Sequence, residues 1–411
     1  MQKKTVYVLM PRNSRAWRGA EALWVTAAGW AGAAEQHYGS SWIGTSDTVA
    51  KAEDVLHYPL GSTTVVNTDK KGKYPWLPMV FKTLLKDILL KRSQPKEWAI
   101  EKDGPWKDET VKMVWEQHDL FPGPGYKIAK KLKVPFVLYV HGPAVWEASK
   151  WGVKRPVWGN WLEKNIEAAS LKRADLVACV TEEVRQKLID MGVQEHKTLV
   201  SPMSVDNKLF YPGKDVQHLK KELKIEHKTV IGWTGSFRSF HGLDTVVKAF
   251  LKIHKNHPDT VLILVGDGSE KEHIERLVHK MELQHVVLFP GRKPFAEIPD
   301  YVACFDIALV SAKTAEGFHY SPIKLREYMA AGKAAIAPLA GDLPLQFTEG
   351  EQVLFYEAGN EEHLESRLQL LINDVPFRNA LGRNANEFVT SSSTWLHELK
   401  KVIAKLEANT L

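Results

Sequence analysis

The stretch Gly317-Phe318-His319-Tyr320-Ser321-Pro322-Ile323-Lys324-Leu325-Arg326-Glu327-Tyr328-Met329-Ala330-Ala331-Gly332-Lys333 decides how the rest of the chain is interpreted. It predicts a loop followed by a helix, because Ser321 suits an N-cap, Pro322 the first helical position and Gly332 the stop. Lys324 and Glu327 are three residues apart and share a face near the start of this helix.

A helix start with an adjacent lysine favours an anion, because its first N–H groups have no partner within the helix. Glu327, one turn further on, suits the hydroxyl groups of a ribose. Together these features predict a site for a nucleoside diphosphate. A capped surface helix with an ordinary Lys/Glu pair is the open alternative.

The same stretch resembles the C-terminal-domain motif of retaining glycosyltransferases of family four (glycosyl transferases group one), which have the GT-B fold. Members of that family carry two glutamates separated by seven residues. Glu327 matches the second glutamate, and His319 stands at the position of the first. The resemblance implies that Glu327 holds the donor ribose and that His319 faces the donor sugar. It also implies that the main chain around the helix start contacts the diphosphate, through Tyr320, Ser321, Pro322 and Ile323.

Composition limits the class of protein. The chain has 411 residues, of which 44% are hydrophobic and 25% charged, which is enough for two globular domains. A net charge of +6 is compatible with an anionic substrate or an anionic membrane surface. No nucleic-acid-binding motif is found, so no nucleic-acid partner is expected. No apolar run reaches the ~20 residues that span a bilayer, so we expect a cytoplasmic protein, with peripheral contact at the inner membrane face left open.

The N-terminal half begins as a nucleotide-type α/β domain. The apolar run 5–10 predicts a buried strand, and a turn containing Gly19 leads into a helix. The resemblance implies that Gly19 contacts the donor. A later apolar strand, 134–140, ends at His141, and ligands of open parallel sheets collect at this end of the strands. The position of His141 alone supports a structural role as well as a functional one. The resemblance implies a functional role.

The C-terminal half repeats the pattern of strand, glycine turn and helix, starting with the strand 229–234. In the family the following turn binds the donor diphosphate, which implies contacts from Gly235 and Ser236 and a bidentate phosphate contact from Arg238. A further strand ends before Arg292 and Lys293, which the resemblance places at the nucleotide base.

Two segments raise the question of membrane contact. Residues 76–92 form an amphipathic pattern of apolar residues interleaved with Lys82, Lys86, Lys91 and Arg92. The preferred interpretation is a helix that packs on the core with a solvated lysine face; the alternative is a helix on an anionic bilayer. Four tryptophans lie between residues 146 and 161. We rank aromatic packing as their first interpretation, contact with the acceptor as the second and contact with a membrane as the third.

The predicted architecture is α/β GT-B, with two doubly wound parallel-sheet (Rossmann-like) domains facing a cleft. The expected domains are 1–205 on the acceptor side and 206–388 for the nucleotide sugar, with a helix in 389–411 packing back on the first. The predicted function is a retaining hexosyltransferase that moves a sugar from a UDP- or GDP-sugar to a hydroxyl of a glycan, lipid-linked or small-molecule acceptor. Arg238, Lys324 and His141 are the catalytic candidates.

No metal or other cofactor is expected, because no Asp-x-Asp motif lies near these turns. A sugar-nucleotide-binding protein with weak catalysis and a membrane-associated accessory subunit of a glycan assembly pathway are the two alternatives. Turnover assays combined with binding measurements distinguish the first alternative from the predicted glycosyltransferase. Vesicle-binding measurements distinguish the second.

Overall fold

The computed structural model describes residues 3–12, 21–56 and 76–410, so the predicted donor contact Gly19 lies outside the described residues. The chain divides into two compact α/β units. The first comprises Met1–Met203, His319–Ser321 and Trp395–Leu411, and the second comprises Ser204–Phe318 and Pro322–Thr394. A segment of three residues from the fold-deciding stretch is therefore counted with the first unit.

Buried apolar runs form the sheet of the first unit. Its strands in the described residues are parallel except for the β2–β3 pair, and they lie in the order β3-β2-β1-β4-β5-β6-β7. Strand β5 is buried at every position, as expected for a parallel sheet covered on both faces. The strands are β1 (Lys4–Leu9), β2 (Ser41–Gly44), β3 (Val49–Ala50), β4 (Thr110–Gln117), β5 (Phe136–Val140), β6 (Leu176–Cys179) and β7 (Thr198–Val200).

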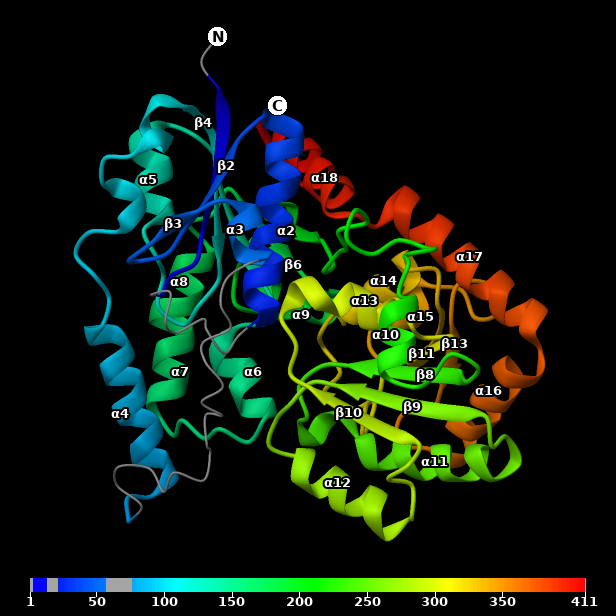
Figure 1. Ribbon diagram of the computed structural model, residues 1–411. Helices are drawn as coiled ribbons and strands as arrows, with labels where there is room; N and C mark the ends of the chain where they lie inside the picture. Colours follow the sequence, from blue (N-terminus) through cyan, green and yellow to red (C-terminus); the bar gives the residue numbers. More distant parts are fainter. Residues whose placement is uncertain (1–2, 13–20, 57–75, 411) are drawn as a thin grey trace. The chain divides into compact units, whose positions relative to one another are not determined.

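Helices α2 and α18 pack against each other in the first unit (Figure 1). A Cβ atom at Gly29 of α2 would lie 2.3 Å from the Trp395 ring, so the glycine lets the two helices approach closely. Trp30 extends this contact into the core, with its ring 5.1 Å from Trp395 and 4.2 Å from Trp115. The helices of this unit are α2 (Glu21–Tyr38), α3 (Ala52–Leu56), α4 (Met79–Arg92), α5 (Gly125–Leu132), α6 (Ala144–Lys150), α7 (Trp158–Leu162), α8 (Ala168–Leu171), α9 (Glu182–Asp190) and α18 (Trp395–Thr410).

The described strands of the second unit form a fully parallel sheet in the order β10-β9-β8-β11-β12-β13. The order reverses between β8 and β11, and ligands of such sheets bind outside the carboxyl ends of the strands at this switch point. In the first sheet the same reversal occurs between β1 and β4. The strands of the second sheet are β8 (Thr229–Thr234), β9 (Thr260–Val265), β10 (Val287–Gly291), β11 (Ile307–Leu309), β12 (Ala334–Pro338) and β13 (Leu354–Tyr356).

Helices cover both faces of the second sheet. Helices α11 and α12 lie on one side of β8–β10, and α13 and α14 lie on the other side (Figure 1). The first face is sealed by a core that includes Phe250 of α11, Ile274 of α12 and Leu368 of α16. The helices of this unit are α10 (Gln217–Glu222), α11 (Leu243–Asn256), α12 (Lys271–Lys280), α13 (Ile298–Ala303), α14 (Ile323–Ala330), α15 (Leu343–Gln346), α16 (Glu361–Asn373) and α17 (Val375–Ser392).

Helix α14 is not the capped surface helix that the sequence analysis gave as the alternative. It begins one residue later than expected, with Pro322 at the N-cap, and every residue from Leu325 to Ala330 is buried. Arg326 is buried because its guanidinium donates to Ser393 Oγ at 3.0 Å and to Gln346 Oε1 at 2.6 Å. The helix ends as expected at Gly332, whose φ of +70° favours glycine.

Helix α4 also differs from the preferred interpretation. Its buried residues are Thr83 and Asp87, whereas Phe81 and Leu89 are exposed. The preferred interpretation holds only in part, because Leu90 packs on the cluster of Leu120 and Phe121 while most of the apolar residues face solvent. Among the described residues, no helix is both long and apolar enough to cross a membrane.

Candidate functional site

The turn after β8 is fixed by close contacts with the turn after β9. The Gly235 N–H donates to Val265 O at 2.9 Å, and the Phe237 N–H donates to Asp267 O at 3.0 Å. A Cβ atom at Gly266 would lie 1.8 Å from Gly235 O, so only glycine fits there. This packing leaves Ser236 and Arg238 exposed at the carboxyl ends of the strands.

The ammonium group of Lys324 lies at this turn. Its Nζ atom is 4.2 Å from the centroid of the Trp233 ring, and a Cβ atom at Gly235 would lie 2.5 Å from it. Nζ is buried and has no hydrogen-bond partner within the described part of the chain. Burial lowers the pKa of Lys324 to about 7, although the Glu327 carboxylate acts in the opposite direction. A buried ammonium without a partner is costly, so the site favours an anionic ligand.

Arg238 and Lys324 act on the same neighbour, His241. Burial, together with the charges of Lys324 and Arg238, lowers the pKa of His241 to about 2, against the effect of the contact with Ser311 O. The His241 ring lies 5.4 Å from the Trp233 ring, and its Nδ1 atom is 3.5 Å from Ser311 O, just after β11. The structure thus brings both predicted cations to the switch point of the second sheet, beside a neutral imidazole.

Glu327 and Tyr328 follow Lys324 on α14. Glu327 is buried, which raises the pKa of its carboxyl group to about 7 against the effect of Lys324. Tyr328 is also buried, and its hydroxyl accepts a hydrogen bond from the Thr234 N–H at 2.8 Å. This bond ties α14 to the end of β8, so Lys324 and the glycine turn are held together.

Arg292 and Lys293 follow β10 at the same edge of the second sheet. The Gly266 N–H donates to Gly291 O at 2.9 Å, which places this turn next to the turn after β9. The Lys293 ammonium lies 5.3 Å from the centroid of the Tyr301 ring, and hydrogen bonding to Tyr301 raises its pKa. Lys293 is therefore engaged with α13.

His141 lies at the carboxyl end of β5 in the first unit. Its Nε2 atom is 3.0 Å from Gln117 Oε1, which assigns the ring proton to Nε2. Burial lowers the pKa of His141 to about 4, with Glu147 acting against this shift. His141 is thus a neutral donor at ordinary pH.

Glu167 supports the segment that follows His141. It lies in a π-helical turn, Glu163–Glu167, and its Oε1 atom is 2.9 Å from His118 Nε2. The same carboxylate accepts from the Ala144 N–H at the start of α6. His118, directly after β4, therefore helps to hold the carboxylate that receives the start of α6.

His319 is fully buried in the first unit. Its Nε2 atom is 3.1 Å from Glu147 Oε1, its carbonyl accepts from Thr181 Oγ1 at 2.9 Å, and the Trp146 ring lies 5.0 Å away. A carboxylate from α6 therefore lies beside the histidine that occupies the position of the first family glutamate.

The residues around the helix start fall in both units. Tyr320 and Ser321 belong to the first unit with His319, whereas Pro322 and Ile323 belong to the second with Lys324. Ser321 and Pro322 are buried, and Tyr320 and Ile323 are half-buried. The second unit therefore gathers Gly235, Ser236, Arg238, Arg292, Lys293, Lys324 and Glu327, and the first gathers His141, His319 and Glu147.

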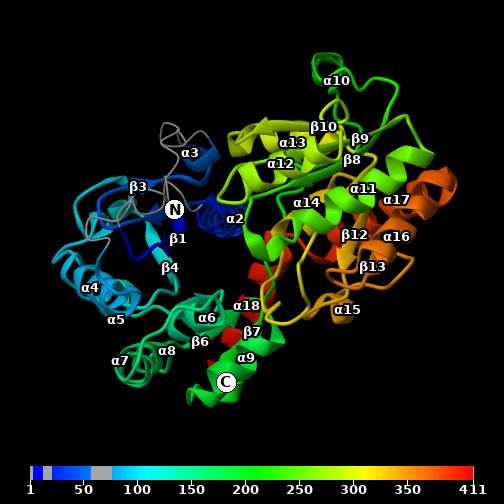
Figure 2. The same cartoon turned by 90° about the horizontal axis from the view of Figure 1, so that it is seen from below.

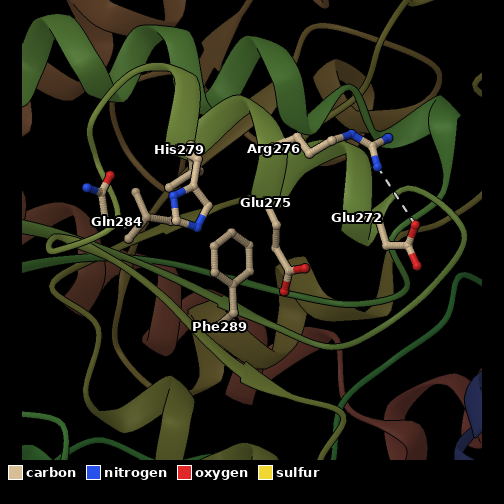
Figure 3. A pocket seen from close by; sticks show the side chains of 8 residues that line it. Glu272, Glu275, Arg276, His279, Gln284 and Phe289 are labelled. Carbon is tan, nitrogen blue, oxygen red and sulfur yellow. Dashed lines mark ion pairs between the residues drawn. The ribbon is translucent and has the colours of Figure 1, made fainter.

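A surface hollow between α12 and β10 lies apart from these residues (Figure 3). It has a volume of about 460 Å³ and contains His279, Glu275 and Phe289. Glu272 and Arg276, which are 3.8 Å apart, lie on its rim in the same view. None of its lining residues belongs to the predicted site, and they lie on α12, on β10 and in the turn between them.

Three supporting residues were missed from the sequence. Trp233 lies under the Lys324 ammonium, Tyr328 joins α14 to β8, and Glu147 pairs with His319. Tyr328 stands next to Glu327 in the fold-deciding stretch, so its position was a usable signal. Glu147 gave no such signal, because it lies 172 residues from its partner. Among the described residues, no group of three or more His, Cys, Asp or Glu side chains is arranged to hold a metal ion.

Comparisons with known proteins show that the chain is similar to glycosyltransferases. Residues 215–388 match the family model "Glycosyl transferases group 1", and residues 113–209 match "Glycosyltransferase Family 4". An uncharacterized glycosyltransferase of Methanocaldococcus jannaschii is 26% identical over 64% of this chain and 66% of its own length. The N-acetyl-alpha-D-glucosaminyl L-malate synthase of Bacillus anthracis is 26% identical over 55% of this chain and 57% of its own length. The matches thus span less than two thirds of each relative.

Solved structures share the fold. Anabaena HepE in complex with UDP-glucose gives a TM-score of 0.63 at 15% identity, covering 99% of this chain and 100% of that one. Sucrose-phosphate synthase from Thermosynechococcus elongatus also gives 0.63, at 18% identity, with coverage of 98% and 99%. These likenesses confirm the GT-B fold of two parallel-sheet α/β domains.

Proposed function

The chain is a group 1 glycosyltransferase of the family-four kind, and on that premise we propose that it transfers a sugar from a nucleoside diphosphate donor to an acceptor hydroxyl. The proposal includes retention of the anomeric configuration, as the family resemblance implies. HepE was solved with UDP and with UDP-glucose, which makes a UDP-sugar the first donor to test. The family matches favour neither a binding protein nor an accessory subunit.

The Lys324 ammonium carries this proposal. It is buried at the Gly235 turn without a hydrogen-bond partner among the described residues, and Arg238 lies close enough to act on the same histidine. Charge grows on the departing diphosphate in the transition state, and cations already held in place stabilise it without reorganisation. In this proposal Lys324 and Arg238 bind the diphosphate, together with the first N–H groups of α14.

The remaining residues of the second unit suit the nucleoside. Glu327 lies one helical turn from Lys324, where its carboxylate accepts hydrogen bonds from ribose hydroxyls in this proposal. Arg292 follows the neighbouring strand and borders the base. Lys293, engaged with Tyr301, contributes less than Arg292.

The candidate residues of the first unit are neutral or acidic. His141 is uncharged and its Nε2–H is held by Gln117 Oε1, which leaves Nδ1 to accept a hydrogen bond from a sugar or acceptor hydroxyl in this proposal. The His319–Glu147 pair brings a carboxylate beside the position of the first family glutamate. No general base is assigned, since the leaving diphosphate can take the acceptor proton. The proposal requires no metal, because two side-chain cations neutralise the diphosphate.

Binding and turnover test this proposal together. Calorimetry with UDP and GDP should show binding of one of them to the wild-type protein and a loss in Lys324→Met. Lys280→Met, an exposed lysine on α12, is the matched control and should bind normally. A panel of UDP- and GDP-sugars with glycan and lipid-linked acceptors then tests transfer. Binding without turnover on that panel would favour the binding-protein alternative.

A further inference from the structure

Helix α4 presents an apolar stripe to solvent. Phe81, Leu85, Ile88 and Leu89 are 57%, 39%, 41% and 54% exposed. Their spacing places them on one face of the helix, covering an arc of about 100°. Exposed apolar residues scattered singly need no explanation, but a contiguous stripe indicates a binding surface.

The opposite face of α4 is held to the core by two polar residues and by Leu90, which packs on the cluster of Leu120 and Phe121. Asp87 is buried and accepts from Arg155 Nε at 2.8 Å and from Trp158 Nε1 at 3.1 Å. Thr83, one turn earlier, is buried on the same side. Rotating α4 to bury its apolar stripe would break this ion pair and leave Asp87 without its partners, so the stripe stays outward.

The charges beside the stripe are all basic. Lys82 and Lys86 flank it along one side, and Lys91 and Arg92 lie at its C-terminal end. Asp87 is the single acidic residue of α4, and its charge is already paired with Arg155. An apolar face bordered by cations has the composition of a helix that lies in the interface of an anionic bilayer.

A neighbouring segment shows a second exposed apolar site. Val157 has φ +61° and ψ −61°, and the Trp158 N–H donates to Pro156 O at 2.6 Å, which is the rare γ-turn with positive φ. A β-branched residue is strained in this conformation, yet the side chain is 92% exposed and gains nothing from packing. Trp158 joins this turn to Asp87 of α4, and Figure 2, like Figure 1, shows α7 and α4 as neighbours.

We propose that this α4 surface, made of Phe81, Leu85, Ile88 and Leu89 with Lys82 and Lys86, docks the protein on an anionic phospholipid bilayer. The helix has 14 residues and a length of about 21 Å, too short to span a bilayer but suited to lying in its interface. A second copy of the chain is a poorer occupant, because a symmetric contact would bring like charges together. The docking surface is separate from the proposed donor site.

Vesicle binding of the full chain tests this proposal. The wild-type protein should co-sediment with vesicles of phosphatidylcholine mixed with phosphatidylglycerol, and far less with phosphatidylcholine alone. Each lysine near an anionic surface contributes about fivefold, so Lys82→Gln/Lys86→Gln should lower the partition coefficient by about 25-fold. Added salt should weaken binding of the wild-type protein. Leu85→Ser/Leu89→Ser should weaken it by about tenfold or more.

Helix α5 supplies matched controls in the same unit. Lys127 and Lys131 are exposed and four residues apart, and Leu132 is 42% exposed. Lys127→Gln/Lys131→Gln and Leu132→Ser should leave vesicle binding within about twofold of wild type. Circular dichroism and UDP binding, measured on every variant, separate this test from misfolding and from failure of the proposed donor site.

Three results would overturn the docking proposal. The first is a wild-type protein that ignores anionic vesicles. The second is an equal loss of binding in the α5 controls, which would indicate non-specific charge attraction. The third is a dimer in solution that Leu85→Ser/Leu89→Ser dissociates, since the stripe would then be covered by another copy.

Discussion

The hydroxyl of Tyr328 contacts Thr234 twice, accepting from its N–H at 2.8 Å and lying 3.0 Å from its Oγ1 atom. Thr234 is the last residue of β8 and precedes Gly235, whereas Tyr328 lies on α14 one turn after Lys324. The pair therefore fixes the helix that carries the ammonium to the turn that faces it. Because both residues are buried, neither partner can turn to water if the other is lost.

Tyr328→Phe tests this connection. Removing the hydroxyl leaves the buried Thr234 N–H unsatisfied, which should lower the free energy of unfolding by about 1–3 kcal/mol. It should also weaken UDP binding, because the Gly235 turn is no longer tied to α14. Urea unfolding and calorimetry measure the two effects. Tyr7→Phe removes a comparable bond to Trp106 O in the first unit and should leave UDP binding unchanged.

Lys324→Met should separate stability from binding. Burial lowers the pKa of Lys324 to about 7 from 10.5, so the folded protein holds this proton less well than the unfolded chain does. The lysine therefore lowers stability below pH 10.5, most fully below pH 7, and the penalty diminishes as pH rises through that window. We expect the ligand-free variant to be at least as stable as wild type at pH 7. A large fall in its melting temperature with intact UDP binding would contradict this account.

The pH dependence of donor binding should follow the same group. A bound diphosphate favours the charged ammonium, so UDP binding above pH 7 should take up a proton at Lys324. The affinity should therefore fall as pH rises from 7 to 9, by at most about tenfold per pH unit. Calorimetry in buffers of different ionisation enthalpy measures the uptake, and Lys324→Met should lose it. Below pH 7 Glu327 becomes protonated and ribose binding weakens.

The His319–Glu147 pair predicts a double-mutant cycle. Glu147→His removes the carboxylate that lies 3.1 Å from the buried imidazole and should cost about 1–3 kcal/mol of stability. His319→Glu restores the family residue but places it against Glu147, so it should also destabilise. The exchange His319→Glu/Glu147→His should recover part of both losses in urea unfolding. Strictly additive losses in the double variant would show that the contact carries no energy.

Much of the fold could be predicted from local patterns. Apolar runs predicted the strands that become β1, β5 and β8, and Gly332 marked the end of α14. These predictions succeeded because strand burial and helix stops depend on a few neighbouring residues. Burial of α14 depended instead on distant partners, such as Ser393 for Arg326, and could not be read from its own sequence.

Helix α4 is a second feature that local sequence could predict only in part. Its sequence pattern predicts an amphipathic helix but does not determine which face of the helix is buried. That choice rests on Asp87 meeting Arg155, 68 residues further along the chain. In the same way Arg238 and Lys324 could be predicted as candidates from their turn and helix contexts, whereas Trp233 and Glu147 were found only in the folded chain.

A crystal structure with UDP bound tests the central claim most directly. The account predicts phosphate oxygens within hydrogen-bonding distance of Lys324 Nζ and the Arg238 guanidinium, beside the Gly235 turn, with ribose hydroxyls on Glu327. A diphosphate bound elsewhere, with the Lys324 ammonium still unpaired against Trp233, would contradict it.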